Sequence, residues 1–572
     1  MSRTASGLPK TKQVKRLQKN GDTYIYEVTT KYNPDKRYNE HVSSKLIGKI
    51  LKGGEEIVST RPRRSTKCEK PKAVRKTVGV TDILDWIGRE SGIDSDLLLS
   101  TDKGTAQKIM SIARFWMANP DKSIRRIEEW QIDHCIPYTD GMSEDMCYML
   151  MKELGRDVTT SQSYFRCRAV HTSSRASIAV DTTTVSSYSE NLNDVRFGYN
   201  KDGNSLAAVK LLTLFDVESH QPIAFSRQPG NIPDVISVLN TLKQLSVFSM
   251  EKPLLVLDGG FFSESNILAF IRARTKFLMR GQVDSKWILP ELESVDGIEK
   301  ASNICPFDPD IYGTTCRISH GFTWERTRSR GGSSKGDTVY EEHRLYLHFF
   351  LNTDRARIER ASLNTDILRV KEQLERGVDQ SLLSDTEKRI VKKFLILKER
   401  GGSLSVKVDD DAVKEASKYY GYFVLVSNEK QDTFKALKEY RLRERTEEGF
   451  RIDKQYNDAH VTRSKSTASL EGRFFCQFVA YGYEEYFRQQ LSRLKDSLAV
   501  PNGDPEHDNS ETFRKEKSLL SWLNKMSVAK LFDWFDTIQE TTVDTKIGKA
   551  RWRTETIERD RLFLQKLGVL KA

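Results

Sequence analysis

The sequence predicts an α/β core interrupted by an inserted domain, with a small β unit and a helical region before the core and a helical region after it. Apolar strands and amphipathic helices alternate from about residue 171 onward. The alternation stops near residue 284, and a buried strand, YYGYFVLVSN, resumes it near residue 419. A chain of 572 residues is also too long for one ordinary core. The predicted regions are 1–75, 76–170, 171–283, 284–418, 419–496 and 497–572.

The first region is a basic leader followed by a small β unit. The stretch YIYEVTTKYNPDKRYNEHVSSKLIGKI alternates apolar and polar residues on both sides of an NPDKR turn, which is typical of a β-hairpin. Residues 1–80 hold 20 Lys and Arg against 7 Asp and Glu, so this end carries +13 and the rest of the chain −1 of the net charge of +12. Concentrated positive charge favours binding to a polyanion, and a basic tail that is merely solvated is the alternative.

Residues 76–170 are predicted to form a compact helical domain. Apolar residues recur at helical spacing in TDILDWIGRESG, TAQKIMSIARFWMAN, SIRRIEEWQIDHC and SEDMCYMLMKELGR, with Thr, Ser or Asp at cap positions. The spacing shows no clear helix-turn-helix. Any role of this region in binding DNA is therefore a hypothesis from charge and helicity.

The core is predicted to run as three strands, a helix, a strand, a helix and a strand. The strands are ASIAVDTTTV, AVKLLTLFDV, QPIAFSRQPG, PLLVLDGGF and TKFLMRG, and the helices are IPDVISVLNTLKQL and SESNILAFIRAR. The inserted region contains a β segment, HRLYLHFFLNTD, a basic glycine-rich loop and two charged helices. A core helix, GRFFCQFVAYGYEEYFRQQLSRL, and a polar linker lead to the C-terminal helical region.

Composition excludes several classes of protein. No run approaches the roughly 18 to 20 apolar residues of a membrane span, and the basic start lacks the apolar stretch of a signal peptide. We therefore expect an intracellular protein without a membrane partner. Seven scattered cysteines without a C-x-x-C pair favour neither a disulfide framework nor a zinc ribbon. Five residues could in principle bind zinc, although their spacing matches no standard pattern: Cys305, Cys316, His320, His343 and His348.

Two aspartates stand at the ends of predicted core strands. Asp181 ends ASIAVD and Asp258 ends PLLVLD, so both side chains are expected in the crevice at the carboxyl ends of the strands. Either could simply cap the next segment or stabilise a turn. The two glycines after Asp258 weaken that alternative, because they allow a sharp turn and the close approach of another group.

The stretch EYRLRERTEEGFRIDK, residues 439–454, is predicted to be helical and is rich in charges of both signs. The simplest interpretation of this stretch is a solvent-exposed helix face with several salt bridges. At about 100° per residue, however, four residues share an arc of about 60°: Tyr440, Arg443, Glu447 and Lys454. Glu444 lies near this arc and is the rival to Glu447 as a third acid.

Two strand-end aspartates and one helical glutamate would form a site of hard oxygen ligands. Such a site suits Mg²⁺ or Mn²⁺. Two such ions can activate a water or a 3′-hydroxyl and stabilise the leaving oxygen in phosphodiester displacement. Basic residues on the glutamate's own helix would then bind the phosphates of a nucleic acid.

At these residues the chain resembles a known family. Tyr440-x2-Arg443-x3-Glu447-x6-Lys454 reproduces the YREK signature of the bacterial cut-and-paste insertion-sequence transposases that have a DDE catalytic triad. AVDTTTVSSYSE, GYNKDGNSLAAVKLLTLFD and LLVLDGGFFSESNI are also similar to core segments of that family. The 189 positions between Asp258 and Glu447 leave room for the family's inserted domain. The resemblance covers about 171–480.

The resemblance implies an RNase H-like core, a nuclease and strand transferase with two Mg²⁺ or Mn²⁺ ions, and recognition of the element's terminal inverted repeats. It implies three metal-binding catalytic residues, Asp181, Asp258 and Glu447. It further implies four DNA-contacting residues, Tyr440, Arg443, Lys454 and Arg280, of which Arg280 in FLMRG is the less specific match.

Relatives that form a DNA hairpin stack a flipped base on an aromatic residue of the inserted domain. Trp324 and Trp287 are the candidates here, and a buried core tryptophan is the alternative for each.

The resemblance also implies transposon-end and target DNA as partners, a homodimer in the DNA complex, and a cytoplasmic, nucleoid-associated location in a bacterium or archaeon. The alternatives are a stand-alone RNase H-like nuclease and a catalytically inactive, domesticated DNA-binding derivative.

Overall fold

The structure is a computed structural model. It describes residues 8–54, 56–58, 73–172, 177–187, 195–196, 207–229, 253–325, 338–400, 403–443, 461–462, 466–500, 510–545 and 548–570. The chain divides into two compact units. The smaller contains residues 1–72 and 544–546, and the larger contains 73–543 and 547–572.

The smaller unit contains an antiparallel sheet in the order β1-β2-β3-β4. The NPDKR turn joins β2 to β3, and the side chain of Asn33 accepts hydrogen bonds there from the backbone N–H groups of Asp35 and Lys36. Ile25 and Val28 are buried in this sheet. The strands are β1 (Lys10–Leu17), β2 (Thr23–Asn33), β3 (Tyr38–Ile50) and β4 (Glu56–Val58).

The larger unit begins with β5 (Ala73–Thr77) and the predicted helical region. Side-chain oxygens of Asp102 and Ser143 accept hydrogen bonds at the starts of α3 and α5, as the cap residues in the sequence predict. The helices are α1 (Gly79–Glu90), α2 (Ile93–Ser100), α3 (Lys103–Ala118), α4 (Ile127–Asp133), α5 (Glu144–Arg156) and α6 (Thr159–Val170).

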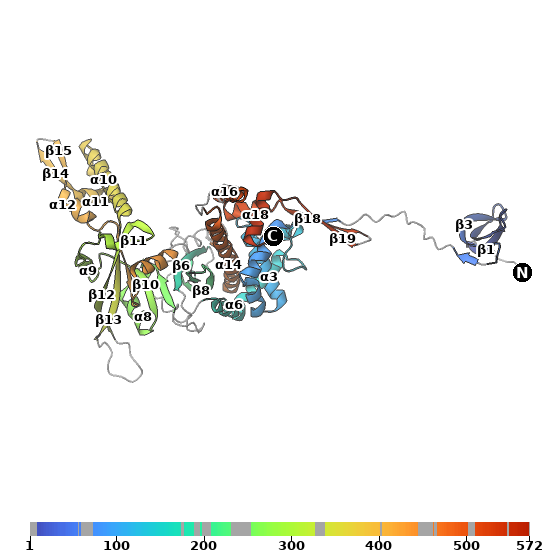
Figure 1. Cartoon of the computed structure of the whole chain (residues 1–572), viewed down its shortest axis with the longest axis horizontal. Coiled ribbons are helices and arrows are strands. Elements are labelled where there is room, and N and C mark those ends of the chain that lie inside the picture. Colours follow the sequence, from blue (N-terminus) through green and yellow to red (C-terminus); the bar gives the residue numbers. More distant parts are fainter. Residues whose placement is uncertain are drawn as a thin grey trace, which may run out of the picture. The chain divides into compact units, whose positions relative to one another are not determined.

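Among the described residues, ten strands of the larger unit form one mixed sheet (Figure 1). Its order is β11-β12-β13-β16-β10-β9-β6-β7-β8, and β17 also pairs with β6. β9 runs parallel to both β6 and β10, whereas β7 and β8 are antiparallel to their neighbours. The first strands and the helix between β9 and β10 are β6 (Ser177–Ser187), β7 (Ala208–Asp216), β8 (Pro222–Pro229), β9 (Leu254–Leu257), α8 (Glu264–Arg272) and β10 (Lys276–Gly281).

The predicted α/β alternation is therefore present. The predicted helix IPDVISVLNTLKQL lies outside the described residues.

The sheet has an apolar layer on each face. Successive residues of β9 alternate between two hydrophobic clusters, with Leu255 in the larger and Val256 in the smaller. The larger cluster also contains the core of the helical region, including Ile109 and Phe115. The smaller is completed by apolar residues of a helix over 433–443.

Residues 284–418, the predicted inserted domain, contribute strands to the core sheet. β12 pairs with β13, β13 with β16, and β16 with β10. β12 is an 18-residue strand that the sequence did not predict. The elements are α9 (Leu289–Glu293), β11 (Ile304–Cys305), β12 (Asp308–Glu325), β13 (Thr338–Asn352) and β16 (Tyr422–Ser427).

Between β13 and β16, residues 353–417 fold around a hydrophobic cluster of their own, which we call the insertion subdomain. Its second charged helix is shorter than predicted, because LILKER forms a strand instead of continuing it. The elements are α10 (Thr353–Glu375), α11 (Asp385–Phe394), β14 (Leu395–Arg400), β15 (Ser403–Val408) and α12 (Asp410–Ser417).

The C-terminal region pairs with the first strand of the larger unit. β18 pairs with both β19 and β5, so the C-terminal region contains a β-hairpin that the sequence did not predict. Among the described residues, no helix is long and apolar enough to cross a membrane. The elements are β17 (Val461–Thr462), α14 (Thr467–Ser497), α16 (Glu511–Leu523), α17 (Val528–Phe535), β18 (Gln539–Thr545), β19 (Gly548–Arg553) and α18 (Glu558–Leu567).

Two glycines let α5 and α14 pack at backbone contact. A Cβ on Gly472 would lie 1.8 Å from the carbonyl oxygen of Met151, and a Cβ on Gly155 would lie 1.8 Å from that of Ala468. Since both obstacles are backbone atoms, no side-chain rearrangement makes room for a larger residue. This contact fixes the helical region against the long core helix.

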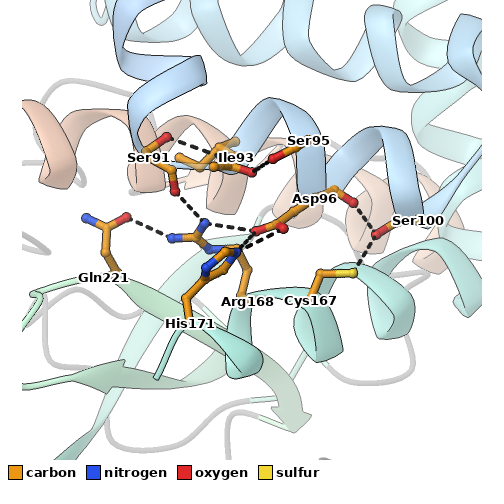
Figure 2. Close-up of polar contacts among 10 residues, drawn as sticks. Ser91, Ile93, Ser95, Asp96, Ser100, Cys167, Arg168, His171 and Gln221 are labelled. Atoms are coloured by element: carbon orange, nitrogen blue, oxygen red, sulfur yellow. Dashed lines mark hydrogen bonds and ion pairs between the residues drawn. The ribbon is translucent and has the colours of Figure 1, made fainter. Parts of the chain in front are cut away.

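A buried ionic network joins the helical region to the sheet. Figure 2 shows Asp96 of α2 between Arg168 and His171 at the end of α6. Arg168 donates to Asp96 at 3.0 Å and to Gln221, the residue before β8, at 3.1 Å. Asp96 and Arg168 are 3% and 4% exposed, so each depends on the other for compensation of its charge.

We expect Arg168→Ala to lower the free energy of unfolding by about 3 to 5 kcal/mol, because it removes the guanidinium that pairs with the buried Asp96 carboxylate. Arg166→Ala is the matched control, since Arg166 lies on the same helix and is exposed. Urea unfolding of both variants measures the difference. Equal destabilisation would contradict this role of the network.

Glu485 on α14 is 6% exposed, and burial raises its pKa to about 8 although Arg488 acts in the opposite direction. Because this pKa lies above the ordinary 4.5, the folded protein keeps a proton that the unfolded chain releases. The free energy of unfolding therefore falls as the pH rises from about 4.5 to about 8.

We expect Glu485→Gln to remove this part of the pH dependence. Unfolding of the wild type and the variant at a series of pH values across that window measures it. A constant difference between the two proteins at every pH would show that Glu485 does not titrate in this way.

Candidate active site

Three strands bring acidic and basic positions to one edge of the sheet. Leu257 of β9 pairs with Val180 of β6 on one side and with Met279 of β10 on the other, and both pairings are parallel. The residues that follow these three in the sequence are Asp258, Asp181 and Arg280. Their backbones are therefore neighbours at the carboxyl end of β9. Asp181 does not end its strand as the sequence predicted, because β6 continues in its pairing with β7 and ends only at Ser187.

Asp258 caps a short turn directly after β9. Its carboxylate Oδ1 accepts a hydrogen bond from the backbone N–H of Gly259 at 2.6 Å, and its side chain is 40% exposed. Gly259–Phe261 form a 3₁₀ turn, and neither glycine has a left-handed φ. The turn thus holds the carboxylate in place and leaves part of it open to solvent.

The helix over 433–443 carries Arg443 to Asp258. Its apolar side packs on the sheet through Leu437 and Tyr440, which belong to the smaller hydrophobic cluster. The guanidinium of Arg443 lies 5.1 Å from the ring centroid of Tyr440, and its Nη2 lies 3.6 Å from Oδ1 of Asp258. Arg443 is thus an ion-pair partner of the strand-end carboxylate.

Tyr440 and Arg443 are both buried, at 3% and 2% exposure. Their predicted contacts with DNA phosphates stay predictions. Arg280 is half-buried, and its side chain lies within 4 Å of the space where a Cβ on Gly259 would stand. Arg280 is therefore beside the Asp258 turn.

Trp287, the first candidate for base stacking, is half-buried among aromatic side chains. Its ring stacks on His320, with centroids 4.4 Å apart, and on Phe262, with centroids 5.9 Å apart. Burial lowers the pKa of His320, which favours its neutral imidazole. These contacts fit the core alternative for Trp287, and its base-stacking role stays a prediction.

Trp324, the second candidate, is held by polar groups. Its indole N–H donates to Glu341 at 3.2 Å, and the guanidinium of Arg272 lies 3.6 Å from its ring centroid. Hydrogen bonds from Arg272 and His343 lower the pKa of Glu341 to about 2, so this carboxylate stays ionised as the acceptor. A base-stacking role for Trp324 also stays a prediction.

Several predicted site residues lie outside the part that the structure describes. These are the side chain of Asp181 and all of Glu444, Glu447 and Lys454. Among the described side chains, no group of three His, Cys, Asp or Glu could hold a metal ion. This covers the five residues considered for zinc, of which His348 instead bonds Thr315 at 2.7 Å.

The fold and the site define an α/β protein whose sheet edge gathers carboxylate and guanidinium groups. The chain belongs to the transposase DDE domain family, whose model matches residues 172–482, more than half of the chain. The family implies nuclease and strand-transfer activity in general.

A cryo-EM structure of the piggyBac transposase synaptic complex with hairpin DNA is similar at 9% identity and a TM-score of 0.35. The similarity covers 79% of this chain and 78% of that chain. A likeness of this size carries no argument about function. A comparison with curated proteins gave no match.

The sequence did not predict that Arg443 would pair with Asp258. A signal was present, because Ala436, Leu437 and Tyr440 form an apolar stripe that Arg443 continues at helical spacing. The network around Asp96 was also missed, and nothing in the local sequence distinguishes Arg168 from the exposed Arg166 of the same helix.

We expect Arg443→Ala to lower DNA cleavage by about tenfold or more, equivalent to about 1.4 kcal/mol, because Asp258 loses the cation beside it. Arg441→Ala is the control. Arg441 lies on the same helix but pairs with Asp308 at 2.7 Å, so cleavage should stay close to that of the wild type.

Cleavage rates measured beside thermal unfolding separate the local effect from a loss of folded protein. We expect Arg443→Lys to recover part of the activity, since it restores a positive charge. Full activity in folded Arg443→Ala would contradict a role for this ion pair.

Proposed function

We propose that the chain is an insertion-sequence transposase with the YREK signature. It binds the terminal inverted repeats of its element, cleaves the DNA at those ends and joins the 3′ ends to target DNA. The observation that carries this proposal is the register that aligns Asp181, Asp258 and Arg280 side by side where β9 ends, in a chain of the DDE family.

The proposal includes an RNase H-like core made of β6 to β10. Support comes from their arrangement, in which three consecutive antiparallel strands, β6, β7 and β8, are joined by two parallel ones, β9 and β10. The helix α8 connects the parallel strands β9 and β10, as in a βαβ unit. The strands β11 to β13 and the insertion subdomain are the proposed insertion into this core.

We assign catalysis to Asp181, Asp258 and Glu447, which would hold two Mg²⁺ or Mn²⁺ ions. Three carboxylates are the donor set that these ions prefer, and the partly exposed carboxylate of Asp258 is accessible to a ligand. Such ions, when bound, supply Lewis-acid stabilisation of the attacking and leaving oxygens.

The chain's own residues would position that site. Arg443 keeps Asp258 oriented through its ion pair, and Arg280 adds positive charge for a phosphate at the same edge. Glu447 comes four residues after Arg443, and residues at this spacing lie on the same face of a helix.

The proposed partners are the element's end DNA and target DNA, in a complex with two copies of this chain in the bacterial or archaeal cytoplasm. Basic residues 1–80 and the helical region are the proposed end-binding parts. Lys454 and Arg443 of the YREK signature are the proposed phosphate contacts.

We expect Asp181→Ala, Asp258→Ala and Glu447→Gln each to abolish Mg²⁺-dependent cleavage of a labelled element end while leaving binding to that end detectable. The reason is that each substitution removes one of three carboxylates on which metal binding depends. Denaturing and native gels of the same reactions measure strand cleavage, joining and hairpin formation together.

Glu444→Gln is the matched control for Glu447→Gln. Loss of activity in Glu444→Gln with full activity in Glu447→Gln would transfer the third carboxylate to Glu444. A wild-type protein that binds the ends and never cuts them would overturn the enzyme assignment and favour a domesticated DNA-binding protein. Cleavage without any joining would favour a stand-alone nuclease.

A further inference from the structure

The insertion subdomain, residues 353–417, presents two charged helices with different charge arrangements. Figure 1 shows α10, α11 and α12 grouped with the β14–β15 hairpin. Buried residues of all these strands and of α10 and α11 form one hydrophobic cluster, including Val370, Ile390 and Val406. The exposed side chains of α10 and α11 are therefore not part of this cluster.

Five cations of α10 and its C-cap have partners within the helix, and Arg360 has no ion pair among the described residues. Ion pairs join Arg355 to Glu359, Arg357 to Asp354 and Arg369 to Asp366, at 2.7 to 2.9 Å. Two more pairs follow near its C-terminal end, Lys371 with Glu375 and Arg376 with Glu372. These spacings of three and four residues are the ones that stabilise an isolated helix.

The cations of α11 are not arranged in this way. Lys388, Arg389, Lys392 and Lys393 are all exposed. Among the described residues, none of the four takes part in an ion pair with a carboxylate. The acids of the helix, Asp385 and Glu387, lie in its first turn, and Glu387 closes a capping box with Ser384.

The four cations form two rows along the exposed side of α11. Lys388 and Lys392 are four residues apart, as are Arg389 and Lys393, so each row has a spacing of about 6 Å along the axis. Like charges at this spacing repel and cost the helix a few tenths of a kcal/mol per pair. A bound polyanion would remove that repulsion.

The helix dipole explains only part of this arrangement. Lys392 and Lys393 lie in the last turn, where a cation is favourable beside the free carbonyl groups. Lys388 and Arg389 lie one turn earlier, beyond the reach of that effect. The adjoining hairpin adds exposed Lys398 and Lys407, whose positions on β14 and β15 face away from Leu397 and Val406.

We propose that the exposed face of α11 binds the phosphate backbone of duplex DNA without reading its sequence. The inference rests on the proposed function, because it takes DNA as the polyanion that this chain handles. Flexible lysines and an arginine on one convex helix face suit phosphate contacts, which fix position and carry no base information.

The test compares two full-length variants with the same change in net charge. One replaces Lys388, Arg389, Lys392 and Lys393 with Gln, and the control replaces the paired Arg355, Arg357, Arg369 and Arg376 with Gln. Affinity for element-end duplex and for an unrelated duplex is measured across a series of salt concentrations, and circular dichroism confirms that both variants are folded.

We expect the α11 variant to lower the slope of log affinity against log salt by about three to four units on both duplexes, as about 0.9 per phosphate contact requires. The control should change it by less than about one unit. If the fourfold variant is unfolded, Lys388→Gln with Lys392→Gln should give about half the change.

An unchanged slope in the α11 variant, or an equal loss in the control, would overturn the inference. A loss confined to the element-end duplex would overturn its independence of sequence. These outcomes differ from failure of the proposed function, in which the wild-type protein itself neither cuts nor joins an element end.

Discussion

The parallel pairing of β6 and β10 with β9 is the constraint on which the candidate site depends. Asp181, Asp258 and Arg280 are far apart in the sequence, and the parallel register of these three strands makes their backbones neighbours. The register is supported from both faces, because β9 contributes Leu255 to one hydrophobic cluster and Val256 to the other. The apolar layers therefore determine where the polar groups meet.

The helix over 433–443 shows how the same packing brings in a charge. Leu437 and Tyr440 anchor it to the smaller cluster, and this leaves Arg443 with 2% exposure. Burying a guanidinium is costly unless a counter-charge lies nearby, and here the carboxylate of Asp258 and the ring of Tyr440 provide the compensation. The fold therefore holds a positive charge beside a carboxylate before any substrate is bound.

The sequence predicted the elements whose pattern was strong. The five core strands are apolar runs that end in polar residues, and all five are present between β6 and β10. β12 was missed because only three of its 18 residues are buried, so DPDIYGTTCRISHGFTWE has no regular alternation. α11 was extended through LILKER because a short apolar run fits a helix and a strand equally well. Asp258 could be singled out by its position at a strand end, whereas its pairing with Arg443 depends on packing between distant segments.

The helical region belongs to the larger compact unit, whereas the first 72 residues belong to the smaller one. Gly155 and Gly472 bring α5 and α14 into backbone contact, and Arg168 pairs with Asp96 while it bonds Gln221 beside the sheet. Residues 73–172 therefore share one hydrophobic cluster with the core sheet, while residues 1–72 belong to the other compact unit. A truncation that removes the helical region would expose the core helix and the face of the sheet. If the truncated protein no longer bound DNA, the cause could be loss of the fold and not loss of DNA recognition. Removing only the basic β unit separates the two effects, because it leaves the shared cluster intact.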